Sequence, residues 1–145
     1  MWFRLTLVFA LAAALAGCRE HSGALTPAER ERFAAEGVRR QADDLIFRYT
    51  DHPGRRDARW EDRLASIVVT GATVLVHKNE KVGVEITPRT RRWAAVERSG
   101  PRVRIRIGQG RTEELWSFVP PDDPSGWADD IRAVIRRSDS ETNRP

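Results

Sequence analysis

The stretch Arg102-Val103-Arg104-Ile105-Arg106-Ile107 decides the fold class of this 145-residue chain. Apolar and charged side chains alternate in it without a break, which is typical of a β-strand that turns one face to a core and the other to solvent. Gly108-Gln109-Gly110 follows as a turn, and residues 113–119 are expected to return as a second strand. The chain is therefore predicted to contain an antiparallel sheet with one buried face.

More strands are predicted on the N-terminal side of this hairpin. Residues 67–77 are rich in Val, Ile and Thr, with Gly71 as a turn or bulge. A turn over residues 78–81 leads to an alternating stretch at 82–86, and another strand is expected over about 91–98. No connection is long enough for a parallel crossover, so we expect an antiparallel meander of five to six strands.

An N-terminal helix is predicted over residues 27–50. Thr26, Pro27 and Glu29 form a capping-box sequence at its start. Apolar residues then recur at three-to-four spacing, which favours an amphipathic helix; they are Phe33, Val38, Ala42, Leu45, Ile46 and Tyr49. The Asp51-His52-Pro53-Gly54 segment would end this helix, and one further helical turn is expected within residues 55–64.

A C-terminal helix is predicted to close the sheet, with Asp123 as its cap and Pro124 in its first turn. Its apolar stripe contains Trp127, Ile131 and Ile135 at four-residue steps. Short antiparallel strands followed by such a helix resemble a pleckstrin-homology-like domain, over about residues 64–137. The resemblance implies that the helix tryptophan plugs one open corner of a bent sheet, and that lipid headgroups or peptides are candidate ligands. The expected fold class is α+β.

The N-terminus resembles the signal of a bacterial lipoprotein. Arg4 supplies a positive charge, and Leu5 to Leu15 is an apolar stretch of the length found in export signals. That stretch is shorter than the roughly 20 apolar residues that span a bilayer. Leu15-Ala16-Gly17-Cys18 matches the lipobox of that family at all four positions. The resemblance implies cleavage before Cys18 and acylation of its thiol, which would anchor the domain to a membrane.

An ordinary secretory signal is the alternative, cut after Ala14-Leu15-Ala16 and leaving Cys18 as a free thiol. Arg19 follows the cysteine, and the lipoprotein resemblance then favours the outer membrane, facing the periplasm, because an aspartate there tends to retain the protein at the inner membrane. The expected organisation is a signal over 1–17, a lipidated tether over 18–26, one domain over 27–137 and a disordered tail over 138–145.

The residues do not indicate an enzyme. The histidines His21, His52 and His77 lack the spacing of a zinc site, and no serine elbow or phosphate loop occurs. The carboxylate pairs at 43–44, 122–123 and 129–130 are expected on helices or caps, where adjacent side chains do not face each other. No cofactor and no metal are expected. A hydrolase using His52 and an aspartate is the enzymatic alternative.

The most distinctive chemical feature is an arginine-rich segment. Residues 89–111 hold eight arginines against the single acid Glu97. The candidate ligand-binding residues are Arg91, Trp93, Arg102, Arg104 and Arg106. Strand alternation places the last three on one face, which could bind anionic lipid headgroups or lipopolysaccharide phosphates.

The alternative interpretation of this face is a solvated surface balanced by Glu85, Glu113 or Glu114. Two function hypotheses follow. The first is a non-enzymatic envelope lipoprotein with a protein-interaction or structural role and an envelope protein partner. The second is a binding module for anionic envelope components. Nucleic acid is a poor partner, since an export signal would separate the chain from it.

Overall fold

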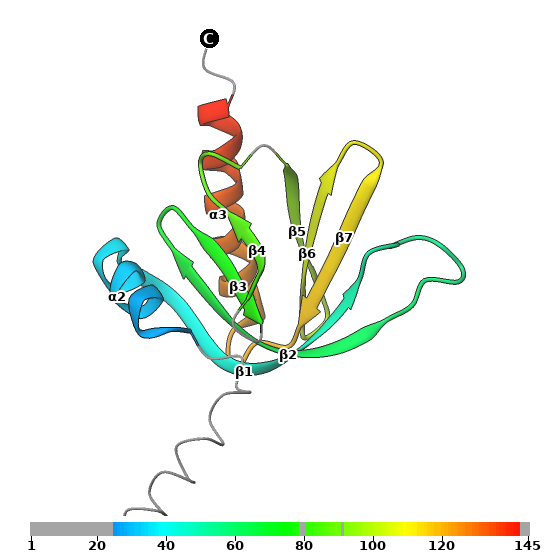
Figure 1. Cartoon of the computed structure of the whole chain (residues 1–145), viewed down its shortest axis with the longest axis horizontal. Coiled ribbons are helices and arrows are strands. Elements are labelled where there is room, and N and C mark those ends of the chain that lie inside the picture. Colours follow the sequence, from blue (N-terminus) through cyan, green and yellow to red (C-terminus); the bar gives the residue numbers. More distant parts are fainter. Residues whose placement is uncertain (1–24, 79–80, 91, 143–145) are drawn as a thin grey trace, which may run out of the picture.

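The computed structural model describes residues 25–78, 81–90 and 92–142 (Figure 1). Its elements are α2 (Pro27–Glu36), β1 (Val38–Thr50), β2 (Glu61–Thr70), β3 (Val74–Lys78), β4 (Lys81–Ile86), β5 (Trp93–Ser99), β6 (Arg102–Gln109), β7 (Thr112–Phe118) and α3 (Pro124–Thr142). The sheet curls into a deep trough, and α3 lies in its concave side (Figure 1). The predicted α+β class is confirmed. The described helices include none that is both long enough and apolar enough to cross a bilayer.

All seven strands form one antiparallel sheet in the order β4-β3-β2-β1-β7-β6-β5. Two three-stranded meanders, β2-β3-β4 and β5-β6-β7, are therefore joined side by side through β1. The prediction of five to six strands was wrong, because the longest strand, β1, was assigned to a helix.

The N-terminal helix is α2, and it ends at Glu36 rather than at residue 50. Its capping box is present as predicted, since the Thr26 hydroxyl accepts from the Glu29 amide and Glu29 accepts from the Thr26 amide. Gly37 stops the helix with a φ of 80°, a conformation in which glycine has little steric cost. The chain then continues directly into β1.

A bulge in β1 explains why its apolar pattern has helical spacing. The β1–β2 register shifts between Ala42 and Leu45, where Asp44 has a φ of 54°. Ala42 on one side of the bulge and Leu45 on the other both pack against the core. The alternation thus skips one position and produces the three-residue spacing of a helix. The aspartates at 43 and 44 consequently lie in a strand, which corrects their expected place on a helix.

The connection from β1 to β2 contains turns and no helix. Backbone hydrogen bonds from Arg55 to His52 and from Ala58 to Arg55 close two of these turns. The helical turn expected within residues 55–64 is therefore wrong, and β2 already begins at Glu61.

The main core lies between the concave face of the sheet and α3. The predicted stripe of α3 is buried there, with Trp127, Ile131, Val134 and Ile135 at most 6% exposed. The Trp127 indole N–H donates to Asp122 Oδ1 at 2.8 Å, which fixes the ring at the start of the helix. The helix continues to Thr142, through part of the segment that was predicted to be disordered.

A second, smaller core lies on the outer face of the sheet. Phe33 of α2 packs there with Leu25, Val68 and Leu75. The β2–β3 pair is therefore covered on both faces, by α3 from within and by α2 from outside. Elsewhere, one face of the sheet is open to solvent.

Candidate functional site

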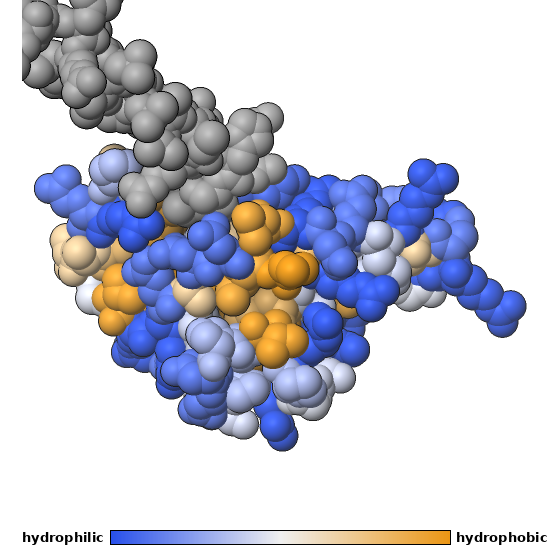
Figure 2. Space-filling model, turned by 90° about the horizontal axis from the view of Figure 1, so that it is seen from below, coloured by the Kyte–Doolittle hydropathy of each residue, from blue (hydrophilic) through white to orange (hydrophobic). Residues whose placement is uncertain are grey.

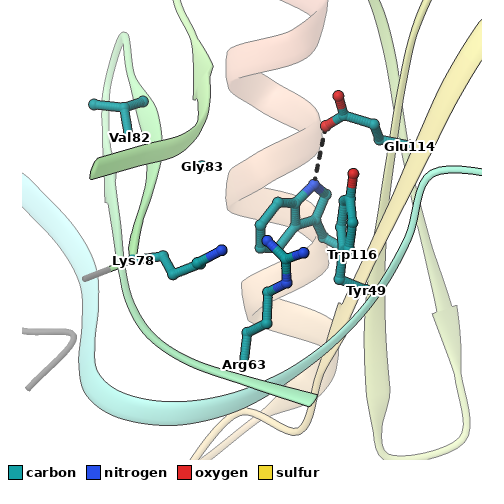
Figure 3. Close-up of a pocket in the computed structure, with 7 residues that line it drawn as sticks. All are labelled: Tyr49, Arg63, Lys78, Val82, Gly83, Glu114 and Trp116. Carbon is teal, nitrogen blue, oxygen red and sulfur yellow. Dashed lines mark hydrogen bonds between the residues drawn. The ribbon is translucent and has the colours of Figure 1, made fainter. Parts of the chain in front are cut away.

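A cavity of about 490 Å³ opens in the trough, with Lys78 and Val82 on one side and Glu114 and Trp116 on the other (Figure 3). Its lining comes from five strands, β1, β2, β3, β4 and β7, and consists of Tyr49, Arg63, Lys78, Val82, Gly83, Glu114 and Trp116. Tyr49 of β1 pairs with Glu61 of β2 on one side and with Trp116 of β7 on the other. Trp116 belongs to the buried core. The cavity thus continues the interior of the sheet. Polar side chains contribute to its lining, and no helix residue is part of that lining.

Aromatic rings connect this cavity to the helix. Trp127 meets Phe118 at a centroid distance of 5.7 Å, and Phe118 stacks on Phe47 at 4.8 Å. Phe47 meets Trp116 at 6.2 Å, and Trp116 lies against Tyr49 at 4.5 Å. The interior therefore changes gradually from an apolar core to an amphipathic wall.

Gly83 lets the two halves of the sheet approach each other beside the cavity. A Cβ atom at this position would lie 2.9 Å from Trp116 Cη2 and 3.3 Å from the carbonyl oxygen of Val76. The indole of β7 therefore rests against the backbone of β4, strands that are not neighbours in the sheet. This contact lies in the wall of the cavity, which both residues line.

Cationic groups point into the cavity from the β2–β3 side. The Arg63 guanidinium lies 4.3 Å from the centre of the Tyr49 ring, and its Nε donates to Glu61 at 3.0 Å. Lys78 reaches toward the same space from the end of β3 (Figure 3). These two side chains provide donors on one wall.

A fixed carboxylate forms the opposite wall. Glu114 accepts from Arg92 at 3.2 Å and from the Trp116 indole N–H at 3.3 Å. Its charge is therefore already compensated within the protein. Glu61 is likewise engaged by Arg63, and Lys78 adds a second cationic side chain to the lining.

Burial raises the pKa of Tyr49 above its ordinary value of 10.0, and the negative charges of Glu114 and Asp51 raise it further, while Arg63 lowers it. The phenol is consequently neutral at physiological pH and can donate a hydrogen bond. Donors from a phenol, a guanidinium and an ammonium around an aromatic floor suit an anionic group attached to a less polar body.

The predicted arginine face exists on the outer side of the sheet. Arg104 is 3.4 Å from Glu97, and Arg106 donates to Glu113 at 2.6 Å. Of the three predicted balancing acids, Glu113 therefore pairs with this face, whereas Glu114 pairs with Arg92 and Glu85 pairs with Arg32. Arg102 has no ion-pair partner among the described residues.

The indole of Trp93, another candidate of the arginine segment, packs on β6. Trp93 pairs across the strands with Gly108 and covers it, since a Cβ there would lie 2.3 Å from the indole. It remains 45% exposed. Arg91 lies outside the described residues.

The two described histidines, His52 and His77, lie in different parts of the fold. His52 is exposed in the β1–β2 connection beside Asp51. His77 is buried under α2, with Nε2 at 3.5 Å from Glu29. Across the described ranges, no cluster of three or more His, Cys, Asp or Glu could hold a metal ion. Cys18 and His21 lie outside the described residues.

Sequence reasoning missed the cavity, because its polar residues are far apart and match no motif. A usable signal was present: Arg63, Lys78 and Glu114 are charged residues at core-facing positions near strand ends. Comparison with known proteins finds no matching family model and no matching curated protein.

Proposed function

We propose that this chain is a lipid-anchored protein of the bacterial envelope whose domain binds an anionic group at the open end of its sheet. It would act as a non-enzymatic binding module, held by acyl chains on Cys18 to the outer membrane and facing the periplasm. The observation that carries the proposal is the cavity lined by Tyr49, Arg63 and Lys78, opposite the end that α3 fills.

The arrangement of the domain supports a pleckstrin-homology-like fold as part of this proposal. Two antiparallel meanders meet through β1, and a C-terminal helix places Trp127 at one end of the trough. This matches what the resemblance implies for the helix tryptophan. Domains of the pleckstrin-homology-like family have seven strands, and the sheet of the described residues has the same number.

The chemistry of the cavity favours an anionic lipid headgroup over the arginine row that the sequence suggested. Arg104 and Arg106 form ion pairs with Glu97 and Glu113, as Arg63 of the cavity does with Glu61, so the shape and the other lining residues distinguish the two sites. The cavity instead combines donors with an aromatic floor and the exposed Val82 at its rim. A phosphate ester with attached acyl or sugar carbons satisfies both parts of such a lining.

Titration of the purified, detergent-solubilised protein with a short-chain phosphatidic acid tests the ligand, followed by isothermal calorimetry. We expect saturable binding that Arg63→Gln combined with Lys78→Gln weakens at least tenfold, since each charge-assisted hydrogen bond contributes about 1.5–3 kcal/mol. Arg98→Gln is the matched control, because this exposed arginine of β5 lies away from the cavity.

Two further measurements separate the parts of the proposal. Competition by inorganic phosphate, with equal affinity per phosphate, would assign the site to a free anion rather than a lipid. Equal binding by the double variant and the wild type would reject the cavity. Mass spectrometry of the mature protein tests the anchor independently, and an unmodified Cys18 would contradict it.

A further inference from the structure

The outer face of the sheet carries an apolar row that the anion site does not use. Ile46 of β1 pairs with Leu64 of β2, and Val119 continues the row immediately after β7. These side chains are 66%, 39% and 45% exposed, respectively. Ile46 and Val119 border a depression of about 350 Å³, and Figure 2 shows hydrophobic residues gathered on this side of the molecule.

Amphipathic side chains surround this apolar row. Trp60 is 43% exposed, and the Arg48 guanidinium lies 4.9 Å from the centre of its ring. Arg102 borders this depression and a second one beside Trp60. Neither Arg48 nor Arg102 has an ion-pair partner among the described residues. Tryptophan and arginine around exposed aliphatic residues are the composition of a surface that lies in a bilayer interface.

The acidic residues on this face determine whether electrostatic attraction or apolar burial would hold the face at a bilayer. Asp44 and Asp62 also line these depressions, so they balance the charges of Arg48 and Arg102. The face therefore has no excess of positive charge that could act at a distance. Contact with lipid must come from burial of the apolar row, which salt does not screen.

The path of the chain directs this same face toward the anchor. Leu25, the first described residue, packs on Val68 and Leu75 on the outer side of the sheet. Val68 and Leu64 project from the same side of β2, and four residues of strand separate them by about 13 Å. Cys18 precedes Leu25 by seven residues, which span at most about 25 Å.

We infer that the domain lies on the bilayer through this lipid-facing row, formed by Ile46, Leu64 and Val119, with Arg48, Trp60 and Arg102 at the headgroup level. The inference rests on the proposed anchoring at Cys18. It adds a second lipid contact and a fixed orientation.

A unique fluorescent label tests the orientation, because acylation would occupy the only cysteine of the chain. Full-length acylated protein carrying Ile46→Cys with an environment-sensitive dye is reconstituted into vesicles of phosphatidylethanolamine and phosphatidylglycerol. We expect a blue-shifted emission and strong quenching by nitroxide-labelled lipid, both unchanged at high salt. Arg136→Cys on the exposed side of α3 is the control and should show neither effect.

A second pair of variants tests the apolar row itself. With the dye at Asp62→Cys, replacing Ile46 and Val119 by serine should reduce quenching severalfold, whereas replacing Arg48 and Arg102 by glutamine should reduce it less. Circular dichroism confirms that each variant is folded. A solvent-like spectrum at position 46, in protein that still floats with the vesicles, overturns the inference and leaves this row to a protein partner. Loss of flotation instead contradicts the anchor.

Discussion

The two ends of the trough are built from the same kind of residue and differ in what covers them. At one end, Trp127 of α3 sits on Phe118 with its indole N–H held by Asp122. At the other end, Trp116 sits beside Tyr49 with its indole N–H held by Glu114, and both residues line the cavity. A helix packs on the first arrangement, whereas the second borders the cavity that we propose as an anion site.

This difference separates the residues that stabilise the curled sheet from those that we propose bind a ligand. The helical end is closed by an apolar stripe, so its side chains contribute mainly to the free energy of folding. The open end keeps charged groups near an aromatic floor, and we propose that these groups serve binding more than stability. Perturbing matching residues at the two ends should therefore have unequal effects.

The largest effect is expected from Trp127→Ala. This ring is 1% exposed and contacts Phe118, so its removal leaves a cavity between α3 and the sheet. We expect the free energy of unfolding to fall by about 3–5 kcal/mol, measured by urea denaturation. Trp60→Ala, which removes a 43% exposed ring on the outer face, should cost about 1 kcal/mol or less. Equal losses would contradict the assignment of α3 as the closing element.

Gly83→Ala should disturb the open end and cost less. The new methyl group would lie 2.9 Å from the buried Trp116 ring, which has little room to move. We expect a loss of about 1–3 kcal/mol together with weaker ligand binding. Gly71→Ala is a matched control, because its methyl would meet only two arginine side chains at 3.6 Å and 3.9 Å. Unchanged stability and binding in the Gly83 variant would mean that this contact does not set the cavity.

Ion pairs at the helical end should contribute a smaller amount again. Arg40 of β1 donates to Asp130 of α3 at 2.8 Å, and this hydrogen bond raises the pKa of Arg40. Arg40→Met should destabilise the fold by about 1–2 kcal/mol, since the pair is only partly shielded from solvent. Arg132→Met, which removes an exposed pair with Asp129, should cost about 0.5 kcal/mol or less. A double-mutant cycle with Asp130→Asn isolates the coupling, and a coupling near zero would contradict it.

Sequence patterns predict the regular parts of this molecule well. The alternation at 102–107 identifies β6, and the Trp127 stripe identifies α3, because each segment has one uninterrupted period. β1 escapes detection because its bulge at Asp44 changes the side that faces the core, which gives a strand the spacing of a helix.

The candidate site is harder to predict for a different physical reason. Arg63, Lys78 and Glu114 converge only because the sheet curls, and curvature depends on long-range packing such as the contact between Gly83 and Trp116. The arginine row illustrates the opposite case. Its common face follows from local alternation and is predicted correctly, but its pairing with acids on neighbouring strands depends on register.

The smallest effect concerns the phenol of Tyr49 in the lining of the cavity. Tyr49 is the single tyrosine of the chain, so tyrosinate absorbance reports this residue alone. Because burial raises its pKa in the folded state above 10.0, the associated stability is fully present below pH 10.0 and is lost as pH rises through the folded pKa. We expect Glu114→Gln to lower the titration midpoint and Arg63→Gln to raise it, since these groups act on the phenol with opposite signs. In urea all variants should titrate together near the ordinary value of tyrosine. A folded protein that titrates with its unfolded chain would place the phenol in bulk solvent and remove one donor from the proposed anion site.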